Sequence, residues 1–171
     1  ITFRPQCPSC RACHSLRIPV PHFRASESQR RAWKRSVEHV EIRIGSPAQS
    51  PEKLDLFERF HHFGHETKGW ELEDEAPDLG FLTDNPFATE EWSFYLGGTL
   101  VGVGYVDVLP EGLSAIYFYW DPMERQRSLG TFNILAIIEA ARRRRLPYVF
   151  LGYYVEGCRS LEDKANFRPN Q

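Results

Sequence analysis

Hydrophobic and polar positions follow two different spacings along the chain, and each spacing predicts its own elements. Residues 37–44 alternate as in a strand, with Val40, Ile42 and Ile44 on the apolar face. Apolar side chains recur at helical spacing after Ser50 and again over residues 131–145. Further short apolar runs indicate strands at residues 92–96, 99–109, 113–120 and 148–154. The pattern therefore predicts an α/β (α+β) fold, in which helices flank a mixed sheet.

Capping and turn residues mark the boundaries of these elements. Ser50 suits the N-cap of the first long helix, and Pro51 suits its first helical position. Gly64 and Gly69 each offer an end for that helix. The pair Gly97-Gly98 lies between two apolar runs and therefore predicts a hairpin.

The first 36 residues differ from the rest in composition. They are rich in proline, cysteine and basic side chains, and the prolines predict loops over most of this stretch. We therefore expect two parts, a cysteine-rich basic N-terminal segment of residues 1–36 and a folded domain of residues 37–171.

The overall composition is that of a globular protein. The 171 residues are 42% hydrophobic and 26% charged, which is enough apolar surface for a core. No apolar run approaches the ~20 residues that span a bilayer, and no secretory pattern begins the chain. With a net charge of −2, nucleic-acid binding would depend on local patches. We expect a cytoplasmic protein with no membrane partner, and the sequence leaves its oligomeric state open.

Three of the four cysteines are crowded at Cys7, Cys10 and Cys13. This spacing suits the ligands of one metal better than disulfides, because short adjacent loops do not easily close in bridge geometry. Zinc or an iron–sulfur cluster would usually need a fourth ligand, from Cys158, from His14 or from a residue upstream of this chain. The alternative is a loop of ordinary thiols, and the sequence leaves both open.

The order of the predicted elements matches the core of a known fold. Three meandering strands, a loop, a helix and a further strand are the order of the N-acetyltransferase fold. In that fold, the loop before the helix offers backbone N–H groups to a phosphate. Residues 125–130 hold this place with the pattern Arg-x-x-Ser-x-Gly, a partial match to the usual Gln/Arg-x-x-Gly-x-Gly/Ala. An acetyl-CoA-dependent N-acetyltransferase is one class consistent with this order.

Longer motifs resemble a more specific family. SLG at 128–130, LGYY at 151–154 and FRP at 167–169 resemble the C-terminal signature of the aminoacyl-tRNA–protein transferases. The cysteine-rich entry at 3–20 and HETKGW at 65–70 are similar to earlier parts of that family. The form GYYVEGC and the CxxCxxC run most resemble its bacterial branch. That branch transfers leucine from leucyl-tRNA to proteins that begin with Asp or Glu, marking them for N-degron degradation. The arginyl branch remains an alternative.

The resemblance implies an aminolysis that needs no cofactor. The α-amine of the acceptor protein attacks the aminoacyl ester, and the 3′-hydroxyl of the tRNA leaves. We expect Asp121 near the attacking amine, with Tyr119 and Tyr153 lining the site. The expected substrate-binding residues are Ser128, Leu129, Gly130, Lys164, Arg168 and Arg17. Of these, Arg168 or Lys164 would hold the acceptor carboxylate, with Arg17 as a further alternative. The basic clusters expected to hold the tRNA are Arg30, Arg31, Lys34 and Arg35, and Arg142 and Arg143 at a helix C-terminus, although such cations also suit a solvated helix end.

Two departures from the family pattern qualify the resemblance. Relatives usually have Tyr immediately before Lys164, where this chain has Asp163. Relatives also extend beyond both ends, and this chain starts at Ile1 with Met123 as its only methionine, so we expect a fragment or a processed form. A non-catalytic module that binds tRNA or degrons is therefore a further alternative.

Overall fold

The protein folds around one six-stranded mixed sheet, as the sequence pattern predicts. The computed structural model describes residues 7–71, 79–84 and 88–171. The strand order is β1-β6-β5-β4-β3-β2. The strands are β1 (His14–Pro19), β2 (Val40–Gly45), β3 (Thr89–Leu96), β4 (Thr99–Leu109), β5 (Gly112–Trp120) and β6 (Tyr148–Tyr154). The helices are α1 (Glu27–Ser36), α2 (Pro51–Lys68), α3 (Gly80–Thr83), α4 (Leu129–Arg143) and α5 (Arg159–Glu162), with 3-10 turns η1 (Val20–His22), η2 (Pro122–Arg127) and η3 (Asp163–Asn166).

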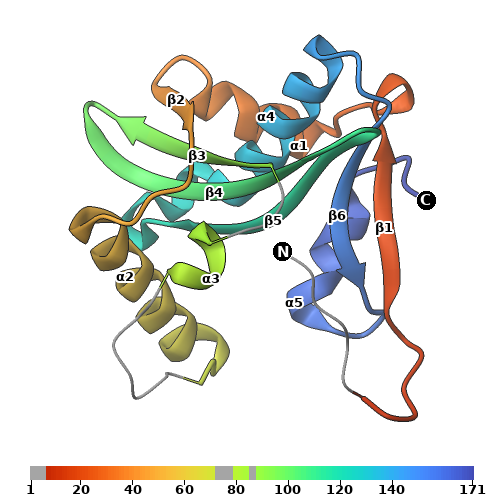
Figure 1. The fold of residues 1–171 in the computed structure, drawn as a ribbon, viewed down its shortest axis with the longest axis horizontal. Coiled ribbons are helices and arrows are strands. Elements are labelled where there is room, and N and C mark those ends of the chain that lie inside the picture. Colours follow the sequence, from red (N-terminus) through yellow and green to blue (C-terminus); the bar gives the residue numbers. More distant parts are fainter. Residues whose placement is uncertain (1–6, 72–78, 85–87) are drawn as a thin grey trace.

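Helices cover both faces of the sheet. Figure 1 shows α1 and α4 on one side of the strands and α2 with α3 on the other. Each face has its own apolar cluster. One contains Phe94, Phe132 and Ile137, and the other contains Leu56, Phe60 and Tyr119. The strands between them are therefore held by burial on both faces, which is the main stabilising contribution to such a layered domain.

Helix α2 confirms the capping residues expected from the sequence. The Ser50 side chain accepts a hydrogen bond from the backbone N–H of Lys53, and Pro51 occupies the first turn. The helix continues through Gly64 and ends at Gly69, which has a left-handed φ of 69°. Gly64 has another role, because the ring of Trp70 folds back onto it and occupies the space of an absent Cβ.

The hairpin between β3 and β4 is also confirmed. Gly97 and Gly98 have φ angles of 56° and 86°, the positive values that a tight hairpin turn requires. Strand β3 begins at Thr89, earlier than the apolar run that starts at residue 92. Its first residues are polar, and they belong to the strand because they pair with β4.

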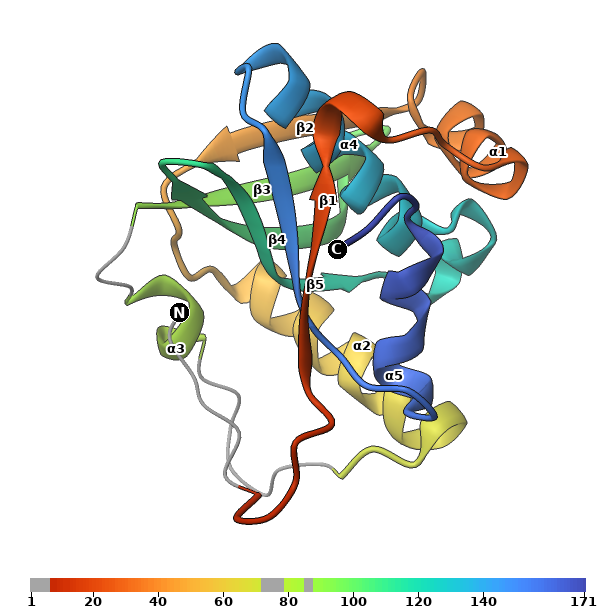
Figure 2. The same ribbon diagram turned by 90° about the vertical axis from the view of Figure 1, so that its right-hand side faces the viewer.

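The N-terminal stretch differs from the loops expected there. Strand β1 lies antiparallel to β6 at one edge of the sheet, and Figure 2 shows the two strands side by side. Helix α1 starts with a capping box between Ser26 and Gln29, and it packs on α4 through Trp33 and Phe132, with 5.3 Å between the ring centroids. Pairing with a distant strand creates β1, so loops were the wrong expectation for this part. The division of the chain at residue 36 stays a prediction.

No helix in the part of the chain that the structure describes could cross a membrane, because none combines the length and the hydropathy that a bilayer span needs.

Candidate active site

The site begins where two parallel strands separate. Strands β5 and β6 pair at Gly112–Tyr148, Leu113–Val149 and Ser114–Phe150, and within the described part of the chain they pair no further. Beyond these pairs, a cleft of about 990 Å³ opens between them. Residues of β5 such as Phe118 and residues of β6 such as Leu151 line it. The cleft is therefore a consequence of the sheet topology.

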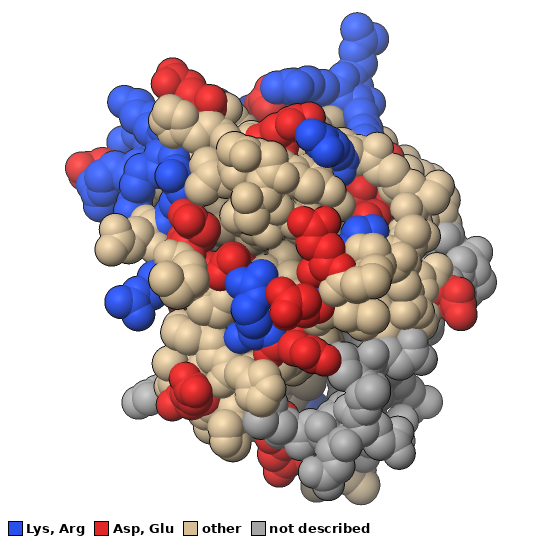
Figure 3. Space-filling model, turned by 90° about the vertical axis from the view of Figure 1, so that its left-hand side faces the viewer, with Lys and Arg blue, Asp and Glu red and all other residues tan. Residues whose placement is uncertain are grey.

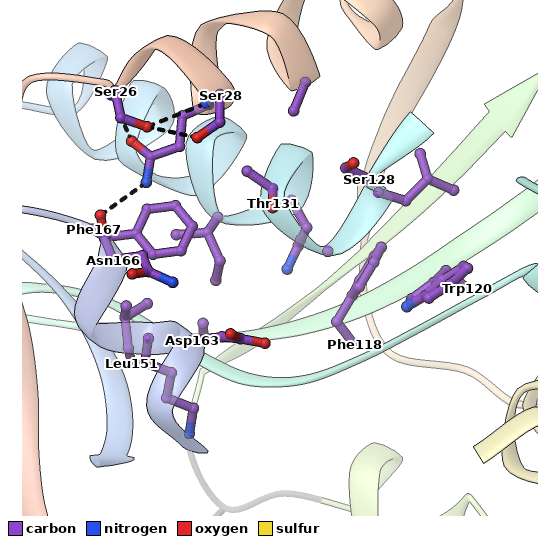
Figure 4. A pocket seen from close by; sticks show the side chains of 18 of the residues that line it. Ser26, Ser28, Phe118, Trp120, Ser128, Thr131, Leu151, Asp163, Asn166 and Phe167 are labelled. Atoms are coloured by element: carbon purple, nitrogen blue, oxygen red, sulfur yellow. Dashed lines mark hydrogen bonds between the residues drawn. The ribbon is translucent and has the colours of Figure 1, made fainter. Parts of the chain in front are cut away.

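Helix α4 begins at this cleft and directs its first turn toward it. Ser128, Leu129, Gly130 and Thr131 all line the cleft, and Figure 4 shows Ser128 and Thr131 on its upper wall. Ser128 has a left-handed φ of 56°, and its side chain caps no N–H group. The first N–H groups of a helix have no intrahelical partner. An added Cβ at Gly130 would meet nothing within 4 Å, so the space before these donors is open and suits an anion such as a phosphate.

The floor of the cleft depends on two glycines in β4. The Phe118 ring lies over Gly102 and Gly104, where its atoms would be 3.0 Å and 3.2 Å from an added Cβ. Beside the ring, Asn133 is 3% exposed, and its Oδ1 has no hydrogen-bond partner among the described residues. Further apolar lining comes from side chains that include Ala115, Ile134, Leu151 and Phe167. This floor can accommodate an apolar group next to one buried amide.

Charged side chains give the cleft a positive balance. Four cations line it, namely Arg31, Arg35, Lys68 and Lys164, and Asp163 is the one carboxylate among the described lining residues. Lys164 is half-buried, and its Nζ donates to the backbone carbonyl of Tyr153 at 3.1 Å. Burial lowers the pKa of the Lys164 ammonium. An anionic substrate bound next to the ammonium would offset the free-energy cost of its burial.

A histidine–tyrosine pair lies beside the cleft. The Tyr117 hydroxyl and the Nε2 of His61 are 2.8 Å apart, and the His61 ring stacks on Phe57. Burial raises the pKa of Tyr117 to about 12, so the phenol stays protonated at neutral pH. The pair links α2 to the strand that lines the cleft.

The structure brings together four of the substrate-binding residues expected from the sequence. Ser128, Leu129 and Gly130 line one side of the cleft, and Lys164 lines it from η3. Two of the expected tRNA-binding residues, Arg31 and Arg35, line it as well. The loop before α4 and the basic face of α1 are therefore parts of one site.

Asp121 and Tyr119 lie outside the cleft, although we expected both to be catalytic residues from the sequence. Asp121 accepts a hydrogen bond from the backbone N–H of Met123 and forms an ion pair with Arg59 at 2.6 Å. Tyr119 is fully buried among apolar residues under α2, where burial raises its pKa. Neither belongs to the described lining of the cleft. Their catalytic roles remain predictions without support from this arrangement.

The other three expected site residues lie around the cleft, outside its described lining. Tyr153 contributes its backbone carbonyl, which holds Lys164. Arg168 is exposed, and its Nε is 3.4 Å from the carbonyl of Ala165. Arg17 lies on β1, with its guanidinium 4.2 Å from the centre of the Tyr148 ring.

The two basic clusters differ in position. On α1, Arg30 and Lys34 are exposed close to the cleft-lining Arg31 and Arg35, and Arg31 pairs with Glu27 at 2.6 Å. At the far end of α4, Arg142 and Arg143 both pair with Glu139, which offsets part of their charge. Figure 3 shows basic side chains gathered in separate places on one face, with acidic side chains among them.

The cysteines do not form a complete metal site among the described residues. Cys7, Cys10 and Cys13 are exposed in the segment before β1, and Cys158 is half-buried after β6. In the described part of the chain, no group of three or more His, Cys, Asp or Glu side chains could hold a metal ion. A zinc or iron–sulfur site at these thiols stays a prediction.

Among the lining residues, Asn133 was not singled out from the sequence. Phe118 belongs to the aromatic end of the strand predicted at 113–120, a possible wall of an acyl pocket, and Lys68 belongs to the HETKGW motif at 65–70, which assigns it no role. The signal that could have indicated Asn133 is the spacing of Gly102 and Gly104, because glycines inside a central strand often mark a close approach.

Solved structures with a similar arrangement of strands and helices identify the fold. The ribosomal-protein-alanine N-acetyltransferase of Brucella melitensis matches with a TM-score of 0.50, at 19% identity, over 74% of this chain and 84% of that one. L-PGS from Bacillus licheniformis matches with a TM-score of 0.61, at 8% identity, over 84% of this chain and 46% of that one. At these identities the likeness establishes the N-acetyltransferase-like fold alone.

Sequence comparison identifies the family. Residues 52–171 match the family model described as arginine-tRNA-protein transferase, C terminus. The aspartate/glutamate leucyltransferase of Pseudomonas fluorescens is 38% identical over 98% of this chain and 71% of that protein. Its counterpart in Chromobacterium violaceum is 36% identical over 99% of this chain and 70% of that protein. The chain therefore belongs to the aminoacyl-tRNA–protein transferase family, and it is an aminoacyltransferase.

Proposed function

We propose that the protein transfers leucine from leucyl-tRNA to the α-amine of proteins with an N-terminal Asp or Glu. In this proposal it acts in the cytoplasm and marks its acceptors for N-degron degradation. The observation that carries it is the cleft between β5 and β6, where an open helix N-terminus, an apolar floor and an excess of cationic side chains meet. These three features suit a phosphate, a leucine side chain and an acidic acceptor, respectively.

The tRNA end is assigned to the α4 side of the cleft. Backbone N–H groups at residues 129–131 offer donors to the phosphate next to the terminal adenosine. Arg31 and Arg35 line the same cleft and add charge for the flexible 3′ strand. Binding of this kind weakens as salt rises, because neutralised phosphates release their counterions.

The leucine side chain is assigned to the apolar floor around Phe118. Ile134 and Leu151 face the same space, and a branched apolar side chain gains free energy on leaving water there. An arginine side chain would need a buried anionic partner. Asp163 is exposed at the rim rather than enclosed in the floor, which favours leucine over arginine as the donor amino acid.

The reaction is an aminolysis of an already activated ester. The acceptor nitrogen forms a bond to the ester carbonyl carbon, and the bond from that carbon to the 3′-oxygen breaks. The nitrogen loses a proton, and the leaving oxygen gains one. Holding both substrates in one cleft makes the attack effectively intramolecular. The protein therefore contributes mainly by binding and orienting the two substrates.

The test is a transfer assay with labelled leucyl-tRNA or arginyl-tRNA and with peptides that begin with Asp, Glu or Ala. We expect leucine on the Asp and Glu peptides only. Transfer of arginine to the same peptides would keep the class and correct the donor. Absence of transfer from either donor, repeated with a version of the chain extended to the length of its relatives, would defeat the proposal.

A further inference from the structure

A pair of adjacent opposite charges occupies the wall of the cleft that faces α4. Figure 4 shows the Asp163 side chain pointing into the cleft from η3, on the opposite side from Ser128 and Thr131. Lys164, the next residue, lines the same cleft. If the helix N-terminus holds the tRNA end, the two charges lie on the side left for the second substrate.

Neither charge is neutralised within the protein. Among the described residues, Asp163 and Lys164 form no ion pair with each other or with any neighbour. The Lys164 Nζ makes one hydrogen bond, to the carbonyl of Tyr153, while an ammonium has three donors. A half-buried cation without a carboxylate is costly in the free protein, and an acidic ligand would supply the missing partner.

The ammonium lies against the backbone of β6 at an irregular point of the strand. Gly152 has a φ of 74°, and a Cβ built on it would be in van der Waals contact with the Lys164 Nζ, at 3.7 Å. The bulge in the β1–β6 pairing lies at the same place, because Leu16 pairs with Gly152 and the next residue, Arg17, pairs with Phe150. The strand is thus distorted where the cation approaches it, a position where bulges commonly redirect side chains.

The chemistry of the acceptor matches this pair. A protein that begins with Asp or Glu carries a positive α-ammonium and a negative side chain within a few bonds of each other. We propose that Asp163 and Lys164 form the acceptor subsite, in which Asp163 binds the α-ammonium and Lys164 binds the side-chain carboxylate of the first residue. This inference rests on the proposed transfer to acidic N-termini, and it excludes Arg168, which lies outside the described lining of the cleft.

The two residues have separable effects in this arrangement. Lys164→Met should reduce the preference for Asp over Asn at the first position, because only the carboxylate needs the cation. A hydrogen bond to a charged group corresponds to about 10- to 100-fold in such a preference. Asp163→Asn should raise the KM for every acceptor peptide by a similar factor and leave the Asp-over-Asn ratio unchanged, because all of them share the α-ammonium.

Transfer from leucyl-tRNA should be measured with peptides that differ only in their first residue, namely Asp, Asn, Glu and Gln. Glu162→Gln is the matched control. Glu162 is exposed next to the pair and lies outside the described lining, so this variant should behave as the parent protein. The KM for leucyl-tRNA should stay constant in all three variants.

Three results would overturn the inference. The first is a Lys164→Met variant that keeps the full Asp-over-Asn preference. The second is an Asp163→Asn variant that changes the choice of donor amino acid while the KM for acceptors is unchanged. The third is equal acceptance of the Asp peptide and its β-methyl ester by the parent protein. This third comparison does not depend on the folding of any variant. Failure of unchanged protein, at the full length of its relatives, to modify any peptide would instead defeat the proposed function itself.

Discussion

At the scale of single residues, Lys164 shows how the burial of a charged group can reduce stability. Burial lowers its pKa below the ordinary value of 10.5. Between the lowered value and 10.5, the unfolded chain binds more protons than the folded protein does. Below the lowered pKa, the folded protein therefore bears the full free-energy cost of burying the ammonium. This cost decreases as the pH rises from the lowered pKa to 10.5, and it is absent at higher pH.

We expect Lys164→Met to be more stable than the parent protein at pH 7. The substitution keeps an apolar stem and removes the charge, and the gain should shrink as the pH approaches 10.5. For a chain of this length, about 1 kcal/mol corresponds to ~2–4 °C in Tm. Thermal unfolding at several pH values measures this, and a lower Tm at pH 7 would show that the ammonium stabilises the fold.

Asp121 has a structural function that accounts for its burial. Its carboxylate caps η2 at Met123 and pairs with Arg59 of α2. We expect Asp121→Ala to lose about 1–2 kcal/mol of unfolding free energy through the cap. The Arg59 side chain is 43% exposed, so its coupling to Asp121 in a double-mutant cycle should be at most about 1 kcal/mol.

Urea denaturation of the two single variants and the double variant measures both quantities. The catalytic role expected from the sequence makes a different prediction for the same variant. If Asp121→Ala unfolds like the parent protein while its kcat falls, Asp121 takes part in the chemistry and the structural explanation is wrong.

At the scale of elements, the end of α2 is fixed by the contact between Gly64 and Trp70. A methyl group on Gly64 would overlap the indole ring. That ring also contacts Phe60 and His61 edge to face. We expect Gly64→Ala to cost about 1–3 kcal/mol, because the ring must shift in a packed environment. Gly45→Ala is the control, since an added Cβ there meets nothing within 4 Å.

The urea midpoints of the two glycine variants test whether the contact between Gly64 and Trp70 fixes the end of α2. We expect a lower midpoint for Gly64→Ala and little change for Gly45→Ala. Equal midpoints would mean that the indole can leave Gly64 without loss and that another contact fixes the end of α2.

Elements with local signals were predictable from the sequence, and elements made by distant pairing were not. Ser50 and Pro51 begin α2 as expected, and Gly97-Gly98 closes the hairpin. The spacing of a capping box at Ser26 and Gln29 also marks the start of α1, a local signal that the expectation of loops in this part overlooked. Strand β1 has no such signal, because its pairing with β6 joins residues from opposite ends of the chain.

The candidate site was predictable only where it depends on one local motif. The loop before α4 was found because helix starts bind anions wherever they occur. The positions of Tyr119 and Asp121 were not predictable, because the pairing of β4 with β5 shifts between Tyr105 and Val106. Such a bulge changes which side chains of β5 face the cleft, and sequence alternation alone does not reveal it.

At the scale of the whole molecule, the two basic clusters should contribute unequally to tRNA binding. Arg31 lines the cleft and lies beside Lys34 of the same helix, whereas Arg142 and Arg143 lie at the far end of α4, outside the described lining. We expect Arg31→Gln with Lys34→Gln to weaken tRNA binding, and Arg142→Gln with Arg143→Gln to have a smaller effect.

Filter binding over a range of salt concentrations measures this difference. Each lost phosphate contact should reduce the slope of log K against log salt by about 0.7–0.9. If the second pair of substitutions reduces the slope as much as the first, the tRNA extends along the whole of α4 and contacts both clusters.

The pairing of β1 with β6 has a consequence for the order of synthesis. A ribosome releases β1 well before β6, so β1 has no partner strand while the residues between them are made. The cleft is completed only after β6, because β6 and η3 supply Leu151, Asp163 and Lys164. A nascent chain interrupted before Tyr148 would expose the free edge of β5 and an unpaired β1 together, and both are open to pairing with other chains. Binding capacity and protection from such pairing therefore arise together, once β6 and η3 have been made.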